Sequence, residues 1–144
     1  MGNGLDISGF DELNAVFAEL KDVPESVMQE SLEAMSKTAL PLIKAKGEAM
    51  GVRDPESNAH ILDTLKETKF VKTENGGHID LQFSGTRTRN GKKTRNAEIA
   101  FINEFGADKK GIEAKQWISH ANESSADAAN KAGQAVLDAW VETL

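Results

Sequence analysis

Two stretches in the first third of the chain carry apolar residues at helical spacing. In the first, Ser8 and Asp11 form a capping-box pattern, which predicts a short amphipathic helix that ends near Lys21. Its apolar positions are Phe10, Leu13, Val16, Phe17 and Leu20. The pattern therefore predicts that the chain opens on a helix with one buried face.

The second stretch predicts a longer helix behind Pro24, a residue that suits a first helical turn. Pro41 falls within its apolar stripe, where it removes a backbone donor and clashes with the carbonyl of Lys37. A straight helix would pay roughly 3 kcal/mol for this proline, so we expect a kink or a break there. The stripe consists of Met28, Leu32, Met35, Ala39 and Leu42.

The middle of the chain changes to the alternation that is typical of strands. Residues 51–58 have the composition of a loop, and the sheet is expected to begin after the apolar patch that follows them. Residues 69–73 and 78–84 flank a Gly-containing turn at 74–77, which predicts a hairpin with one buried face. The apolar residues of the patch and of the second arm are Ile61, Leu62, Leu65, Ile79, Leu81 and Phe83.

The next segment, residues 85–95, contains no apolar side chain and repeats turn formers and cations. A segment of this composition has nothing to bury, so we expect a mobile projecting loop. It holds five basic side chains and no acid, whereas residues 1–56 hold eleven acids and five bases. The basic residues are Arg87, Arg89, Lys92, Lys93 and Arg95.

Beyond this loop, Asn96 is expected to cap a helix through Phe105, closed by Gly106 in a left-handed conformation. The same residues also fit a strand, but we favour the helix. After a turn at 108–111, small and apolar residues near one face predict a long final helix that approaches its neighbour closely. They are Trp117, Ala121, Ala128, Ala132, Val136 and Trp140.

This order of elements predicts a single α+β domain over residues 1–144. Its small, hairpin-based antiparallel sheet packs against two N-terminal helices and a long C-terminal helix. No apolar run approaches the roughly 18 residues of a membrane helix, and no export signal is evident at the start. We therefore expect no membrane contact, and assembly in a cytoplasm.

The candidate chemistry is sparse in this chain of net charge −6. It has no cysteine, and its three histidines lack metal-binding spacing, so we expect no metal and no cofactor. The histidines are expected at the surface or in capping positions. No nucleophile motif or phosphate loop appears, and the 23 acids are expected on solvated helix faces, so we do not expect an enzyme.

Two runs carry a family resemblance: Ala97-Glu98-Ile99-Ala100-Phe101-Ile102-Asn103-Glu104-Phe105-Gly106 and Ala114-Lys115-Gln116-Trp117-Ile118-Ser119-His120-Ala121. Together with the opening Gly9-Phe10-Asp11-Glu12-Leu13, they resemble the small tail-component family of long-tailed bacteriophages. That family typically has an "A-x-F-x-E-F-G" stretch, then "A-R-P-F" and a final amphipathic helix. Lys115-Gln116-Trp117 stands here where Arg-Pro-Phe is usual.

The resemblance implies a structural protein of a phage or prophage that completes the tail or joins head to tail in the neck. It implies copies of this chain in a ring, partners among the head, neck and tail proteins, and a place in the virion. It also implies that DNA passes nearby without specific binding. Phe101, Glu104, Phe105, Gly106 and Trp117 are then the scaffold of the family motif.

The five cations of residues 85–95 are the candidate interaction residues, and two targets remain open for them. One is acidic surface on a neighbouring subunit, which we prefer. The alternative is that the chain is a small nucleic-acid-binding module whose cations contact phosphates. A third possibility is that these cations only keep an exposed loop soluble.

Within the scaffold, two residues have open environments at this stage. Glu104 is either exposed or buried, and if buried it requires an Arg, a Lys or a free helix donor as a partner. Trp117 and Trp140 suit the core and an interface equally well.

Overall fold

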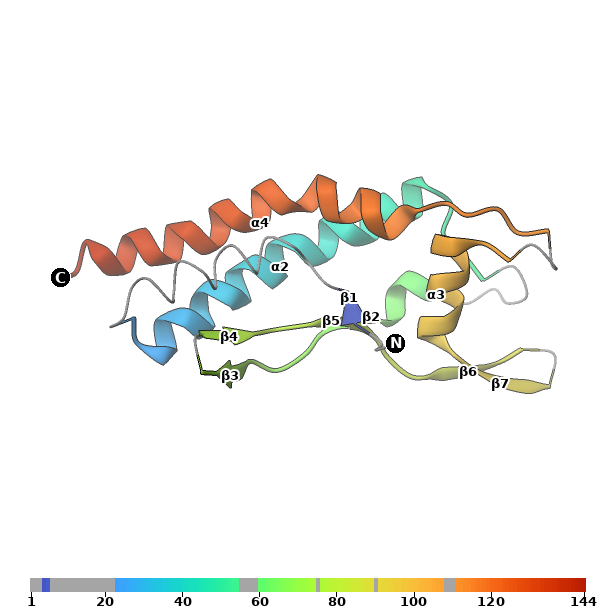
Figure 1. The fold of residues 1–144 in the computed structure, drawn as a ribbon, viewed down its shortest axis with the longest axis horizontal. Coiled ribbons are helices and arrows are strands. Elements are labelled where there is room, and N and C mark those ends of the chain that lie inside the picture. The colour runs from blue at the N-terminus through green and yellow to red at the C-terminus, as the bar shows by residue number, and fades with distance from the viewer. Residues whose placement is uncertain (1–3, 6–22, 55–59, 75, 90, 108–110) are drawn as a thin grey trace.

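A computed structural model describes residues 4–5, 23–54, 60–74, 76–89, 91–107 and 111–144. Figure 1 shows an elongated molecule in which the helix α4 (Trp117–Val141) runs alongside the helix α2 (Glu25–Ala49). Most strands lie on the other side of α2, which contacts both α4 and the strands. The chain is an α+β protein with small antiparallel sheets and a long C-terminal helix, as the sequence predicts. The predicted helix that ends near Lys21 lies outside the described residues.

Helix α2 begins after Pro24 and continues through Pro41 to Ala49, so the predicted alternative of a break is wrong. Ala39 and Ile43, on either side of the proline, are fully buried, whereas Pro41 itself is exposed. Burying Ile43 alone contributes about 2 kcal/mol, and the continuous contact with α4 offsets the cost of the proline.

The contact between α2 and α4 includes several small buried residues on both helices. Ser31 on α2 donates a buried hydrogen bond of 2.8 Å from its hydroxyl to the carbonyl oxygen of Gly133 on α4. The prediction of the buried face of α4 is correct for its first two residues, Trp117 and Ala121. Beyond them it is wrong, because the residues that are buried follow one another at intervals of four. Such rows are inclined to the helix axis and pack as ridges against a neighbour. The row consists of Trp117, Ala121, Ser125, Ala129, Gly133 and Leu137.

The predicted hairpin is present and extends further than expected. Strand β2 (Leu65–Glu67) pairs with β5 (Leu81–Phe83), and β3 (Val71–Thr73) pairs with β4 (Gly76–His78), all antiparallel. The register slips by one residue between the two pairs, since residues 69 and 70 lie opposite residue 79 alone. This is the pattern of a β-bulge.

The sheet has one buried face, as the alternation predicts. Ile79, Leu81 and Phe83 are buried, whereas the polar residues between them are half-exposed. Strand β1 (Gly4–Leu5) pairs with the other edge of β5, so the order is β1-β5-β2. The 3-10 helix η1 (Ile61–Thr64) leads into β2, and His60 caps it by accepting a hydrogen bond from the Leu62 amide at Nδ1.

Within the described ranges, neither α2, α4 nor any other helix combines the length and the apolar character that a membrane span demands.

Replacement of Ala129 by leucine should destabilise the fold by about 1–3 kcal/mol, because Ala129 is fully buried and the added carbons overpack the α2–α4 contact. The matched control is Ala135→Leu, which makes the same chemical change at an exposed position of the same helix. The free energy of unfolding, measured with urea, should stay within about 0.5 kcal/mol of the parent for the control. Equal losses in both variants would contradict the packing described for α4.

Candidate functional site

The basic segment forms a two-stranded antiparallel hairpin, so the expectation of a loop is wrong for residues 86–89 and 92–95. Strand β6 (Thr86–Arg89) pairs with β7 (Lys92–Arg95) through four residue pairs. Gly91 in the connecting turn has φ +77°, which favours glycine. Asn90-Gly91 is the dipeptide that two-residue hairpin turns favour most, and this signal in the sequence was missed. The mobility of the segment stays a prediction.

The alternation of the strands divides the five cations between two faces. Arg87 and Arg89 share one face of the hairpin with Lys92, whereas Lys93 and Arg95 point to the other. The side chains of Arg87 and Arg89 are 11% and 9% exposed. The expectation that nothing in this segment is buried therefore fails at these two residues.

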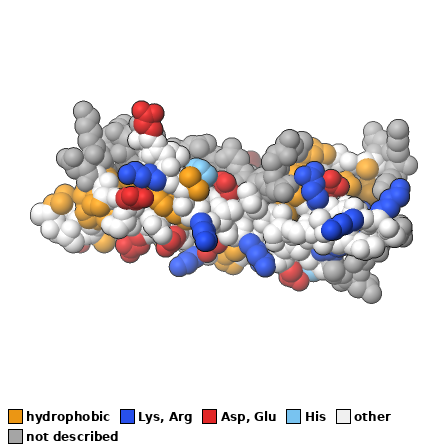
Figure 2. All heavy atoms as spheres, turned by 90° about the horizontal axis from the view of Figure 1, so that it is seen from below, with side chains coloured by type: hydrophobic (Ala, Val, Ile, Leu, Met, Phe, Trp, Pro, Cys, Tyr) orange, Lys and Arg blue, Asp and Glu red, His pale blue; other side chains and the backbone are white. Residues whose placement is uncertain are grey.

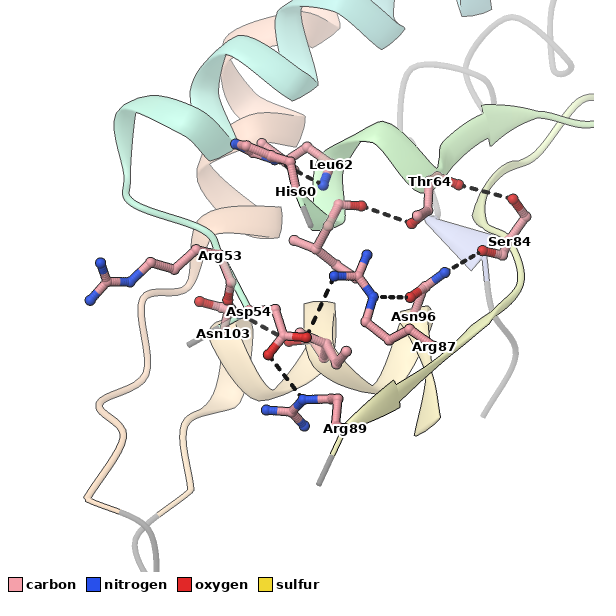
Figure 3. Close-up of polar contacts among 12 residues, drawn as sticks. Arg53, Asp54, His60, Leu62, Thr64, Ser84, Arg87, Arg89, Asn96 and Asn103 are labelled. Atoms are coloured by element: carbon pink, nitrogen blue, oxygen red, sulfur yellow. Dashed lines mark hydrogen bonds and ion pairs between the residues drawn. The ribbon is translucent and has the colours of Figure 1, made fainter. Parts of the chain in front are cut away.

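Both arginines reach the carboxylate of Asp54, whose side chain is completely buried. Arg89 Nε donates to Asp54 Oδ1 at 2.9 Å, and Arg87 Nη1 lies 3.5 Å from Asp54 Oδ2 (Figure 3). A buried carboxylate is strongly unfavourable unless it is paired and hydrogen-bonded. Arg87 and Arg89 supply this compensation, and they thereby tie the hairpin to the segment after α2.

Asn96 completes this network at the base of the hairpin. Its Oδ1 accepts a 2.7 Å hydrogen bond from Arg87 Nε, and its Nδ2 donates one of 2.7 Å to the carbonyl oxygen of Ser84 (Figure 3). Helix α3 (Asn96–Phe105) spans the predicted residues, which confirms helix over strand. The predicted capping role of Asn96 is wrong, because its side chain is engaged with the hairpin and Arg95 occupies the cap position without a side-chain cap.

The other three cations are exposed. Arg95 Nε lies 3.0 Å from Glu98 Oε1, an exposed pair whose contribution to stability is small. In the described part of the chain, neither Lys92 nor Lys93 has an ion-pair partner. Figure 2 shows Lys and Arg side chains at this end of the molecule and also along the middle of the same face. The charge available for contacts is therefore carried mainly by the two lysines.

The family-like runs meet at the joint between α3 and α4. Glu104 is buried and accepts hydrogen bonds from the Ile118 amide at 2.6 Å and the Ser119 hydroxyl at 3.1 Å. Its partner is thus a free donor of a helix N-terminus, one of the alternatives that the sequence left open. A carboxylate at this position also interacts favourably with the helix dipole. Gln116, just before α4, has φ +53° and donates its amide to the Glu104 carbonyl oxygen at 3.0 Å.

Trp117 is a core residue and not an interface residue. It is fully buried, and its indole Nε1 donates to the carbonyl oxygen of Ala100 in α3 at 3.1 Å. Its ring meets Phe83 of β5 edge to face, with 5.8 Å between centroids. Trp117 therefore joins α4 to both α3 and the sheet. Trp140, at the other end of α4, is partly buried against the core.

Gly106 ends α3 with φ +76°, a positive value as predicted, although ψ 178° makes the conformation extended and not left-handed helical. A Cβ atom here would lie 2.7 Å from the Ala114 nitrogen and 2.8 Å from the Ile112 carbonyl oxygen. The segment before α4 therefore lies so close to the backbone of residue 106 that only glycine fits there.

Phe101 and Phe105 stack on the outer side of α3, with ring centroids 6.3 Å apart. Phe101 is partly buried against the core, whereas Phe105 is 66% exposed. Aromatic residues are enriched at the centres of protein interfaces, which makes the exposed ring of Phe105 a candidate contact residue.

A pocket of about 310 Å³ lies between α3, the segment after α2 and the segment before α4. Among the described residues of its lining, Arg53, Arg89 and Lys115 contribute cationic groups, and Glu113 contributes an acid. Asn103 Nδ2 holds the wall together by donating to the carbonyl oxygens of Arg53 and Ile99, both at 3.0 Å. The apolar part of the lining consists of Ile99, Ile102 and Ile112.

Among the described residues, no group of three or more acidic or histidine side chains is arranged to hold a metal ion. Comparisons with protein-family models, curated proteins and solved structures found no match to this chain.

Replacement of Arg89 by alanine should cost on the order of 3 kcal/mol of stability, because it leaves the buried Asp54 carboxylate with less compensation. Lys93→Ala on the neighbouring strand is the control, and it should change the free energy of unfolding by less than about 0.5 kcal/mol. Chemical denaturation measures both. A near-neutral Arg89→Ala would argue against the network as a structural clamp.

Gly106→Ala should lower the stability by about 3 kcal/mol, since the new methyl group meets backbone atoms and the positive φ is retained. Gly111→Ala is matched in conformation, with φ +68°, but nothing described lies within 4 Å of its added carbon. Thermal unfolding should show a markedly smaller loss for Gly111→Ala, about 1 kcal/mol. Similar losses at both positions would exclude the close approach as the cause.

Proposed function

We propose that this chain is a structural subunit of a phage or prophage virion that completes the tail or joins the head to the tail in the neck. It acts through contacts between copies in a ring and with other head, neck and tail proteins, and not by catalysis. Its place is the virion, after assembly in the cytoplasm of the bacterial host. DNA passes nearby and is not bound specifically.

The observation that carries the proposal is the contact between the two family-like runs. The residues that carry the resemblance form the joint between α3 and α4. Glu104 accepts a hydrogen bond from the start of α4, and Trp117 donates one to α3. Gly106 permits the close approach of the segment before α4. Residues in mutual contact depend on one another's size and chemistry. The residues that carry the resemblance therefore form one structural unit and are not spread over unrelated parts of the fold.

The exposed groups beside this joint support a role in binding proteins. Phe105 offers an aromatic ring, and Lys92 and Lys93 offer cations without ion-pair partners in the described part of the chain. Aromatic anchors with charged surroundings are typical of protein interfaces. The buried carboxylates of Asp54 and Glu104 already have structural partners, which supports a structural and not a catalytic use of these acids.

The alternative, a nucleic-acid-binding module that uses Arg87 to Arg95, draws its support from Lys92 and Lys93. Ion pairs with Asp54 and Glu98 partly compensate the other three cations. Two phosphate contacts give a weak salt dependence, with a slope near −2 in log K against log salt. DNA binding at low salt that weakens with a slope of about this size would favour this alternative over the proposed function.

The proposal is tested with the double variant Lys92→Glu/Lys93→Glu, which spares the arginines that clamp the hairpin. We expect an unchanged fold, and binding to neck or tail components weaker by about tenfold, because rim charges govern encounter and orientation. Native mass spectrometry and co-sedimentation with purified neck and tail proteins measure this. The matched control, Lys66→Glu/Lys69→Glu, reverses two exposed lysines near the β2–β3 bulge.

A parent chain that stays monomeric and binds no phage head, neck or tail protein would refute the proposed function. Unimpaired binding by the Lys92→Glu/Lys93→Glu variant would show that the hairpin is not part of the interaction surface.

A further inference from the structure

The two ends of the molecule differ in the charge that they expose. The pocket among α3 and its neighbouring segments lies at the end that carries β6 and β7, and the C-terminal end of α4 lies at the opposite end (Figure 1). The 25 residues of α4 separate these ends by roughly 36 Å, at about 1.5 Å per residue. A single copy therefore cannot join its own two ends.

The pocket is suited to a protruding acidic side chain with an apolar neighbour. Its volume of about 310 Å³ lies at the lower limit, about 300 Å³, of small-molecule sites, so it has room for one or two side chains. Ile102 and Ile112 offer an apolar wall. Arg53 and Lys115 form no ion pair within the described ranges, and Arg53 points away from the Asp54 network (Figure 3).

The end of α4 provides a matching group. Val141 is 48% exposed, and the exposed acid Asp138 lies three residues before it, on the same side of the helix. Glu142, an exposed acid at the C-cap, lies four residues after Asp138 and so close to it. The other large exposed apolar side chains of the described helices and strands have different surroundings. Leu42 and Val71 have lysines nearby in sequence, and Phe105 lies at the basic end itself.

We propose that the pocket of one copy receives the acidic end of α4 from a second copy, with Val141 against the isoleucines and Asp138 and Glu142 near Arg53 and Lys115. This contact is heterologous, because it joins two different surfaces of identical chains. Heterologous contacts close into rings when the rotation between copies permits, and otherwise form open filaments. The inference rests on the proposed function, for which it names the surfaces that join one copy to the next.

Charge reversal in the full-length chain tests the contact. The pocket variant is Arg53→Glu/Lys115→Glu, and the helix-end variant is Asp138→Lys/Glu142→Lys. Each should associate with itself about tenfold or more weakly than the parent, since like charges then face each other. The matched control is Glu123→Lys/Asp127→Lys, which reverses two exposed acids elsewhere on α4 and should associate as the parent does.

The mixture of the two variants gives the decisive result. Acidic pockets then meet basic helix ends, and unaltered pockets meet unaltered helix ends, so the mixture should assemble although neither variant does so alone. Native mass spectrometry should show the two variants alternating, in equal numbers within closed rings. Circular dichroism and thermal unfolding establish that both variants are folded.

Variants that assemble like the parent, or a mixture that fails to recover assembly, would overturn the contact and leave the proposed function intact. A parent chain that stays monomeric at high concentration but binds neck or tail proteins would do the same. A parent chain that neither associates nor binds them would overturn both.

Discussion

The buried carboxylate of Asp54 is the constraint on which this end of the molecule depends. A charge without access to water requires partners, and Arg87 and Arg89 lie close enough to provide them. Because both arginines belong to β6, the hairpin is held against the segment after α2. Asn96 links the same hairpin to the start of α3. The sequence shows a cluster of five cations, but two of them, Arg87 and Arg89, belong to an internal network with Asp54.

The joint between α3 and α4 attaches this end to the long helices. The Glu104 carboxylate accepts hydrogen bonds from the Ile118 amide and the Ser119 hydroxyl at the start of α4. In return, Trp117 of α4 donates a hydrogen bond to α3, and its ring packs against the sheet. Both interactions link the end of α3 with the start of α4. Together they fix the direction of α4 relative to α3. The pocket lies beside this joint and is lined by residues of α3 and of the segment before α4.

The distribution of charge follows from these two arrangements. Arg87 and Arg89 are used in internal ion pairs. Among the described residues at this end, Lys92 and Lys93 on the hairpin and Arg53 and Lys115 at the pocket form no ion pair. Among the described residues, Asp138 and Glu142 at the far end of α4 form no ion pair. An elongated subunit with unlike ends is suited to repeated contacts between copies, which is the behaviour that a ring requires.

The sequence by itself determined the elements with regular spacing. The helix over residues 96–105, the alternation of Ile79, Leu81 and Phe83, and the positive φ of Gly106 all follow from local periodicity or backbone preference, which act within a few residues. Only the tertiary structure decided the fate of the charged and ambiguous residues. Whether Arg89 is free, whether Glu104 is buried and whether Trp117 faces the core depend on segments 14 to 35 positions away. Spacing carries no information on such partners, because burial and pairing arise only when distant segments meet.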